Sequence, residues 1–234
     1  MNNAIIVTGA SSGIGNLISS RLKCWRYTTI FGIDIKKPEH SHHNIIIENV
    51  NNEQGIGKII KKISKDFNII GLVNCAGISL PDTYNLKNWN KTLDINLSGA
   101  MICSKIAAEY MKKNKYGKIV NIASINSLLG FSDNPAYVTS KTALIGLTRA
   151  MAMDYGKYGI RINAISPGYI ITGMTLKSYN DTRRRKDVEK RTILNKWGTP
   201  GEVFDLCEFL LSEKSDYITG QNIIIDGGLS IKGI

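Results

Sequence analysis

Hydrophobic and polar positions alternate along the chain in two kinds of segment. Short runs rich in Ile and Val, each the length of one β-strand, are separated by longer segments in which apolar residues recur with the period of an amphipathic helix. The predicted strands are 4–9, 28–35, 44–50, 69–77, 117–124, 160–168 and 221–226, and the predicted helices lie within 17–25, 55–67, 89–114 and 139–159.

This alternation predicts an α/β fold, a doubly wound and mostly parallel sheet of about seven strands with helices on both faces. No tandem repeat or low-complexity linker interrupts the pattern, so residues 1–234 are expected to form a single domain. Ligands of such sheets bind outside the carboxyl ends of the strands. Candidate functional residues are therefore sought where the predicted strands end.

The stretch TGASSGIG, residues 8–15, directly follows the first predicted strand and precedes a helical segment. Its glycines, Gly9, Gly13 and Gly15, permit a tight turn and the close approach of a pyrophosphate, and the start of a helix offers unpaired N–H groups. A glycine pattern alone would be a weak signal. Its place between a strand and a helix predicts a dinucleotide-binding loop.

Asp34 stands at the end of the second predicted strand, where a carboxylate can accept hydrogen bonds from an adenosine ribose and repel a 2′-phosphate. This predicts NAD as the preferred cofactor over NADP. Lys36 and Lys37 follow at once, and either could reach a phosphate, which keeps NADP as the alternative. Ser12, rather than a basic residue, precedes Gly13, which removes one common phosphate anchor.

Tyr137 and Lys141 stand four residues apart in YVTSK, which reads as the start of a helix, so both side chains lie on one face. An ammonium beside a phenol favours the phenolate and lowers its pKa from the ordinary value of about 10. A phenol tuned in this way can exchange a proton with a substrate. From these two residues alone, packing and solvation remain the other interpretation.

Composition and charge narrow the classes of function. No apolar run approaches the length of a bilayer span, and the N-terminus MNNAIIVTGA does not read as a secretory signal, so a cytoplasmic protein without a membrane partner is expected. Four scattered cysteines without a C-x-x-C pair fit a reducing compartment. The net charge of +11 is spread along the chain, which favours a solvated basic surface over a nucleic-acid partner.

The connection after Asp34 is short and contains Pro38, so no full helix is expected there. It holds all three histidines of the chain, His40, His42 and His43. An exposed loop is expected there and no metal site.

Six motifs complete the pattern: TGASSGIG, NCAG (74–77), Asn96, Ser124, YVTSK and SPG (166–168). In this order and spacing the chain resembles the short-chain dehydrogenase/reductase superfamily over essentially its whole length. Near the C-terminus, ITGQ (218–221) and DGG (226–228) are similar to the 3-oxoacyl-[acyl-carrier-protein] reductase-like members. The resemblance implies a Rossmann-like fold and an oxidoreductase that interconverts a secondary alcohol and a ketone with a nicotinamide cofactor.

The resemblance also implies the catalytic roles. Tyr137 would be the acid/base, and Lys141 would lower its pKa and bind the nicotinamide ribose. Ser124 would bind the substrate oxygen, and Ser127 is a nearby rival that the spacing disfavours. Asn96 would support a proton path from the lysine to solvent through its main-chain carbonyl and a water.

Cofactor contacts are implied at the ends of several strands. In two places the chain departs from the family, since Cys75 replaces the second Asn of the usual N-N-A-G, and Asn49 stands where relatives often carry an Asp that contacts adenine. The implied cofactor-binding residues are Gly9, Ser11, Ser12, Gly13, Ile14, Gly15, Asp34, Asn49, Val50, Asn74, Ala76, Gly77, Tyr137, Lys141, Pro167, Gly168, Ile170 and Thr172.

Residues 173–197 correspond to the family's helical substrate lid, and Met174, Leu176 and Trp197 could line the pocket or pack in the core. The basic run at 183–191 reads either as a solvated helix face or as a clamp for an anionic substrate. The expected substrate is a sugar, polyol or cyclic alcohol.

A 3-oxoacyl thioester reductase is the alternative reaction, although its relatives commonly use NADPH. A nucleotide-sensing binding protein without turnover is the alternative from another class. The segments 89–114 and 139–159 form subunit interfaces in relatives, so a homotetramer or homodimer is expected.

Overall fold

Seven strands form one parallel sheet in the order β3-β2-β1-β4-β5-β6-β7, which confirms the predicted fold class. The computed structural model describes residues 2–22, 25, 28–38, 44–82 and 84–232. The strands are β1 (Asn2–Thr8), β2 (Thr28–Asp34), β3 (Asn44–Ile47), β4 (Phe67–Asn74), β5 (Gly117–Ile122), β6 (Ile160–Pro167) and β7 (Asn222–Ile225).

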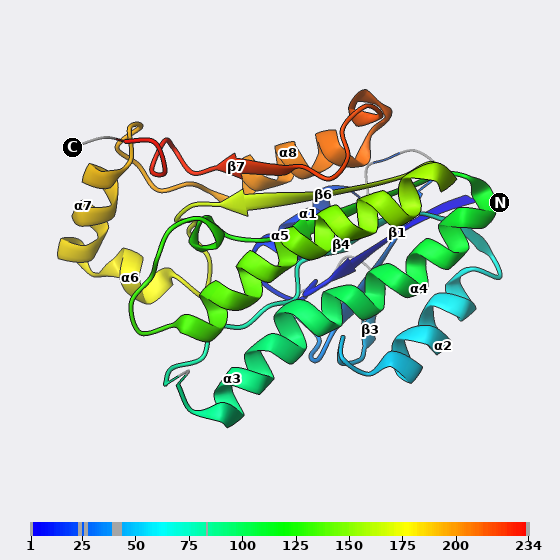
Figure 1. Ribbon diagram of the computed structural model, residues 1–234, viewed down its shortest axis with the longest axis horizontal. Helices are drawn as coiled ribbons and strands as arrows, with labels where there is room; N and C mark the ends of the chain where they lie inside the picture. The colour runs from blue at the N-terminus through cyan, green and yellow to red at the C-terminus, as the bar shows by residue number, and fades with distance from the viewer. Residues whose placement is uncertain (1, 23–24, 26–27, 39–43, 83, 233–234) are drawn as a thin grey trace.

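Helices cover both faces of this sheet (Figure 1). Helices α2, α4 and α5 lie on one face, and α1 and α8 lie together on the other. The helices are α1 (Gly13–Leu22), α2 (Glu53–Ile63), α3 (Leu86–Leu93), α4 (Gly99–Asn114), α5 (Pro135–Tyr155), α6 (Leu176–Asn180), α7 (Thr182–Arg191) and α8 (Pro200–Leu211).

A hydrophobic core fills each face of the sheet. Isoleucines of the strands and of α2 pack with α4 in one core, and the opposite core joins α1 to α8. Burying one such side chain contributes about 1.5–3 kcal/mol. The Ile and Val runs that predicted the strands are therefore the residues that hold the two helical layers on the sheet.

Element boundaries differ from the sequence-based expectation by a few residues. Helix α5 begins at Pro135 rather than 139, because proline suits the first turn of a helix, where its missing N–H costs nothing. It ends at Tyr155, shortly before Gly159 turns the chain with a φ of 77°. Helix α2 stops at Ile63, because Phe67 already pairs with β1 as the first residue of β4.

The strand order reverses at β1, which has β2 on one side and β4 on the other. A crevice forms at such a reversal, outside the carboxyl ends of the strands. Helices α6 and α7 stand at that end of the sheet (Figure 1). The fold thus places the dinucleotide-type loop and the predicted catalytic residues on one edge.

Some expectations fall on residues outside the described part of the chain. His40, His42 and His43 lie there, and so does Cys24. Within the described residues, no group of three or more His, Cys, Asp or Glu side chains is placed to hold a metal ion. No helix among them combines the length and the apolar character needed to cross a membrane.

Candidate active site

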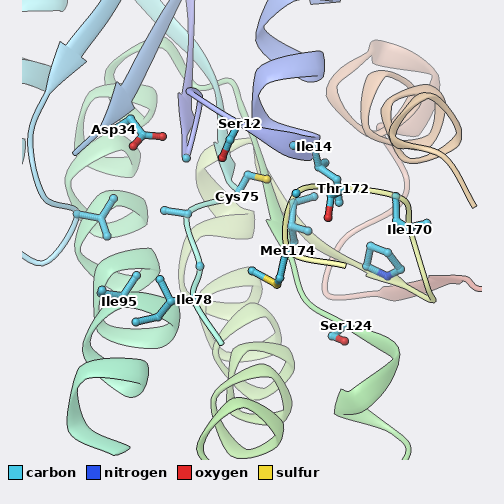
Figure 2. A pocket seen from close by; sticks show the side chains of 18 of the residues that line it. Ser12, Ile14, Asp34, Cys75, Ile78, Ile95, Ser124, Ile170, Thr172 and Met174 are labelled. Carbon is cyan, nitrogen blue, oxygen red and sulfur yellow. The ribbon is translucent and has the colours of Figure 1, made fainter. Parts of the chain in front are cut away.

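A cavity of about 500 Å³ opens at the carboxyl edge of the sheet, a volume typical of small-molecule sites. Figure 2 shows Asp34 at one end, Ser124 and Ile170 at the other, and Cys75 and Met174 between them. Of the predicted site residues, those that line the cavity are Gly9, Ser12, Gly13, Ile14, Asp34, Asn49, Val50, Ala76, Gly77, Ser124, Tyr137, Lys141, Pro167, Gly168, Ile170 and Thr172.

Four predicted residues, Ser11, Gly15, Asn74 and Asn96, lie outside this lining. Ser11 supports the loop, because its N–H donates to the Asp34 carboxylate at 2.9 Å and its hydroxyl to the Lys36 carbonyl at 2.5 Å. Asn74 is buried and donates to Ser104 and Asn121 of the core, at 2.8 Å each. These residues support the segments that line the cavity without lining it themselves.

The glycine loop has the geometry that a bound pyrophosphate requires. Gly9 has a φ of +68°, and a Cβ there would lie 2.8 Å from the backbone of Ala76. A Cβ on Gly15 would collide with the carbonyl oxygen of Gly9. There is therefore no space for a side chain where the loop passes the turn that follows β4. Helix α1 starts at Gly13, so the free N–H groups of its first turn are directed at the loop.

Asp34 marks the end of the cavity that would hold an adenosine. Its carboxylate accepts from the N–H of Ser11 at 2.9 Å and of Lys36 at 3.3 Å, which fixes it beside the glycine loop. Sequence reasoning missed a second carboxylate there, Glu48, which lines the cavity and accepts from the N–H of Asn49 at 2.9 Å. Its place at the end of the third strand was the available signal.

Cys75 lines the middle of the cavity, where its thiol is neutral. Burial raises its pKa to about 11, and the nearby Lys141 opposes that rise only in part. The turn that carries it is tied to β1, because Thr8 Oγ1 accepts from the N–H groups of Cys75 and Ala76 at 3.1 Å each. The departure from the usual asparagine thus leaves the turn intact.

Ser124 and Tyr137 meet at the opposite end of the cavity. Ser124 caps a single 3₁₀ turn (Ile125–Ser127), and its hydroxyl oxygen accepts from the N–H of Asn126 at 3.1 Å. Its side chain also acts on the Tyr137 hydroxyl, where it lowers the pKa of the phenol against the larger effect of burial. With one lone pair occupied by the backbone, the serine proton is free to point at an oxygen beside it.

Lys141 lies one turn of α5 beyond Tyr137, as the spacing predicted. Its Nζ donates to the carbonyl of Ile122 at 2.7 Å and lies 5.8 Å from the centre of the Tyr137 ring. Gly77 leaves room for it, since a Cβ there would lie 3.4 Å from Nζ. Burial lowers the pKa of Lys141 to about 8, and Cys75 opposes this only in part.

The pKa of Tyr137 in this structure is set chiefly by burial. Burial raises the pKa of Tyr137 above its usual value, and the hydrogen bond from Ser124 only partly lowers it. The Lys141 ammonium, itself desolvated, is directed at the Ile122 carbonyl. The prediction that Lys141, with an oxidised nicotinamide beside it, lowers the pKa of Tyr137 concerns the cofactor-bound enzyme and stays a prediction.

Asn96 organises the floor of the site from a five-residue π-helical turn (Asp94–Ser98) between α3 and α4. Such turns recur at functional sites. Its side chain accepts from the N–H of Ile78 at 2.8 Å and donates to the Ile78 carbonyl at 2.9 Å and the Ser140 hydroxyl at 3.0 Å. Ser140 in turn donates to the Tyr137 carbonyl at 2.8 Å, which links the loop to α5.

The turn after β6 closes the cavity at Ile170 and Thr172. Thr175, another lining residue that sequence reasoning missed, accepts from the Thr172 N–H at 2.9 Å and donates to the Ile170 carbonyl at 2.5 Å. Gly168 passes so close to Asp226 that a Cβ would lie 2.8 Å from its Cα. The SPG and DGG motifs therefore pack directly against each other.

Residues 173–197 contain α6 and α7, which stand beside the cavity opening. Met174 lines the cavity, whereas Trp197 is buried and packs against Tyr169 and Tyr179. Arg185 lies over the Tyr179 ring. The remaining basic side chains of the run are exposed and none lines the cavity, which favours the solvated helix face; they are Arg183, Arg184, Lys186, Lys190 and Arg191.

Comparison with known proteins gives consistent matches. The family model described as enoyl-(acyl carrier protein) reductase matches residues 34–230. A 2-dehydro-3-deoxy-D-gluconate 5-dehydrogenase of Bacillus subtilis is 34% identical over 87% of this chain and 75% of its own length. An NAD-dependent glycerol dehydrogenase of Listeria innocua is 32% identical over 97% of this chain and 93% of its own.

A solved structure agrees along nearly the full length. The structure of 4-hydroxyisoleucine dehydrogenase complexed with NADH superposes with a TM-score of 0.91 and 31% identity. The match covers 99% of this chain and all of the other. The similarity therefore extends from the glycine loop to the last strand.

Proposed function

The chain belongs to the short-chain dehydrogenase/reductase superfamily and is a nicotinamide-dependent oxidoreductase, and on this premise we propose that it interconverts a secondary alcohol of the sugar or polyol class and its ketone, using NAD. The observation that carries the proposal is that Ser124, Tyr137 and Lys141 line one cavity together, at the end opposite Asp34.

The described residues fit the dinucleotide. The cradle at Gly9 and Gly15 has no space for side chains, Asp34 is held ready beside it, and the turn at Ile170 closes the far end. When bound, the cofactor accepts or delivers a hydride at its nicotinamide ring. The roles of Gly9, Asp34 and Ile170 are to hold the two ends of that molecule across the cavity.

The proton moves at the Tyr137 hydroxyl. In the oxidation direction Tyr137 takes the proton of the substrate hydroxyl, and in the reduction direction it returns one to the carbonyl oxygen. Ser124 donates its free proton to that same oxygen and so holds it against the phenol. Because burial raises the pKa of Tyr137, a phenolate there requires positive charge beside it, which Lys141 and an oxidised nicotinamide would supply together.

Lys141 acts through position. Its buried amine, held on the Ile122 carbonyl, faces the space between Gly77 and Tyr137 where the nicotinamide ribose would lie. Asn96 fixes the Ile78 loop on that side and supports the proton path from Lys141 to solvent. A pKa of about 8 lets the lysine give up or take a proton near neutral pH.

NAD is preferred over NADP because, among the described residues, two carboxylates, Asp34 and Glu48, line the adenosine end, against the one ammonium of Lys36. A 2′-phosphate placed there would be repelled. NADH should bind at least about tenfold more tightly than NADPH, or ~1.4 kcal/mol. Fluorescence titration of the chain and of D34A measures this, and tighter binding of NADPH by the unaltered chain would contradict it.

The substrate class follows from the relatives whose names include gluconate and glycerol dehydrogenases. Segment 173–197 serves as the lid over the substrate, since α6 and α7 flank the opening and Met174 lines the cavity. A homodimer or homotetramer forms through α4 and α5, and light scattering of the purified chain measures its mass.

Tyr137→Phe tests the function. An enzyme of this kind loses about 10³-fold in turnover, because the proton acceptor is gone, yet still binds NADH. Wild type and variant are assayed with both cofactors against a panel of sugars, polyols, cyclic alcohols and their ketones, by the absorbance of reduced nicotinamide. No turnover of any of these by the wild type, with NADH still bound, would instead identify a nucleotide-sensing protein.

A further inference from the structure

One hydroxyl in the turn after β6 is hydrogen-bonded to two backbone groups at once. Oγ1 of Thr175 donates to the Ile170 carbonyl at 2.5 Å and accepts from the Thr172 N–H at 2.9 Å. The Thr172 carbonyl lies farther from it, at 3.2 Å. A hydroxyl has one proton and two lone pairs, so the two shorter bonds use the proton and one lone pair. Thr175 therefore connects two backbone groups that belong to none of the helices and strands of the fold.

The turn borders the catalytic end of the cavity. Ile170, Thr172 and Thr175 all line the cavity, and Ile170 lies at the same end as Ser124 (Figure 2). Thr172 also lies beside the glycine loop, since a Cβ on Gly13 would be 3.6 Å from the Thr172 Cβ. A hydride passes between the nicotinamide ring and the carbon whose oxygen Ser124 binds, so the ring has to lie at this end. The turn therefore forms part of the wall next to the nicotinamide.

The nicotinamide carries a carboxamide, which has an NH2 donor and an oxygen acceptor. The Ile170 backbone and the Thr172 hydroxyl are the groups expected to bind it. The hydroxyl oxygens of Thr172 and Thr175 are 3.3 Å apart. Because the Thr175 proton is already on the Ile170 carbonyl, Thr172 can only be the donor in this contact, which leaves its lone pairs for the cofactor. Thr175 thus makes Thr172 an acceptor for the carboxamide NH2.

Thr175 also holds the second half of the turn. The first half is tied to Gly198, whose N–H donates to the Tyr169 carbonyl at 2.9 Å and whose carbonyl accepts from the Ile171 N–H at 3.0 Å. After Ile171 the chain is held by Thr175, whose N–H also donates to the Thr172 carbonyl at 3.0 Å. The orientation of the backbone at Thr172 therefore depends on this side chain.

We propose that Thr175 is a positioning residue for the cofactor, because its hydroxyl sets the orientation of the Ile170 carbonyl and the Thr172 N–H in the turn that receives the nicotinamide carboxamide. A turn that is already in its binding conformation loses less entropy when the cofactor binds. Fixing the carboxamide also fixes which face of the ring meets the substrate. The inference rests on the proposed function, in which a nicotinamide dinucleotide occupies this cavity.

Two substitutions and two ligands test it. T175V keeps the shape of the side chain and removes its hydroxyl, whereas T175S keeps the hydroxyl. NADH and ADP-ribose are the matched ligands, because ADP-ribose is the same dinucleotide without the nicotinamide. In calorimetric titrations, T175V should bind NADH about tenfold more weakly and ADP-ribose less than about twofold more weakly, since the lost bonds act at the nicotinamide end. T175S should bind both ligands within about twofold of the wild type.

Thr92 offers the matched control. Its buried hydroxyl donates to the Asn88 carbonyl at 2.8 Å, outside the lining of the cavity. T92V should therefore leave both affinities unchanged. Should T175V not fold, as circular dichroism would show, T175A removes the same hydroxyl with a smaller side chain and should give the same difference between the ligands. An equal loss for both ligands, no loss for NADH, or a T175S variant as weak as T175V would overturn the inference.

The proposed function fails separately, because these titrations require no turnover. If T175V loses affinity for NADH alone but the wild type oxidises no sugar, polyol or cyclic alcohol, the role of Thr175 is retained and the proposed function is lost. A wild type that binds NADH no more tightly than ADP-ribose overturns the role of Thr175, since the turn then contributes nothing to holding the nicotinamide, while turnover of an alcohol would still support the reaction.

Discussion

A buried lysine amine lies at each end of strand β5, one from the strand itself and one from helix α5. The two amines differ in whether a carboxylate pairs with them. Lys118, at the amino end, is 1% exposed, and Lys141, whose Nζ binds the last residue of the strand, is 5% exposed. Lys118 donates to the Asp216 carboxylate at 2.5 Å and to the Ser215 hydroxyl at 3.2 Å. Lys141 donates to one backbone carbonyl, that of Ile122.

The amino end shows how the fold accommodates a buried charge. Asp216 neutralises Lys118, and its backbone carbonyl accepts from Arg161 Nε at 2.6 Å, so one loop after α8 binds two neighbouring strands. Buried charges are normally paired in this way, because an unpaired one costs far more than its packing returns.

The carboxyl end lacks that compensation. Among the residues that the structure describes, no carboxylate forms an ion pair with Lys141, and burial lowers its pKa to about 8. Perturbed groups of this kind cluster at functional sites. The difference between the two lysines teaches that burial alone does not mark function. A buried ionisable group indicates function when no group of opposite charge is placed to neutralise it.

Replacing each lysine by methionine should give the largest contrast. K141M is expected to reduce turnover about 10³-fold, because the amine that positions the cofactor and supplies a titratable proton is lost. K118M should leave turnover per folded molecule unchanged and shift the free energy of unfolding by less than about 1 kcal/mol, since an apolar chain of similar volume replaces a buried ion pair. Steady-state kinetics and urea unfolding measure both; equal activity of the two variants would break the contrast.

Stability should depend on pH through Lys141. Its folded pKa of about 8 lies below the ordinary 10.5, so between these values the unfolded chain binds more protons and the free energy of unfolding rises with pH. Relative to K141M, the wild type should gain about 2 kcal/mol between pH 7 and pH 9.5. Urea unfolding at several pH values measures the gain, and parallel curves for the two proteins would refute the lowered pKa.

The smallest effect concerns the counterion at the amino end. D216A leaves the Lys118 ammonium without its carboxylate and should lower the free energy of unfolding by about 1 kcal/mol, a modest value because Asp216 is 56% exposed and screened by solvent. The matched control is D205A, which removes the exposed and longer Arg21–Asp205 contact of 3.9 Å and should have no measurable effect. A larger loss in D205A would show that burial of the lysine is not what matters.

The strands were predictable because their signal is local. Each run of Ile and Val needs no distant partner to be recognised, and all seven runs became strands of the sheet. The helix ends were less predictable. Where α2 stops and β4 starts depends on the pairing of Phe67 with β1, which no window around residue 67 contains.

The residues of the candidate site also fall into those that local sequence patterns predict and those that they do not. The glycine loop, Asp34, Ser124, Tyr137 and Lys141 carry signals of type and spacing, and the structure brings these residues to one cavity. Glu48 and Cys75 also line that cavity, but their positions after predicted strands do not by themselves show this, because a residue lines a cavity only when several strand ends meet.

The sequence by itself determined the seven-stranded α/β architecture and was enough to predict the reacting side chains, since both depend on short-range patterns. The tertiary structure alone decided the ionisation of Tyr137 and the pairing of Lys118 with Asp216. The physical reason is that desolvation and ion pairing depend on all neighbours packed around a group, and those neighbours come from distant parts of the chain.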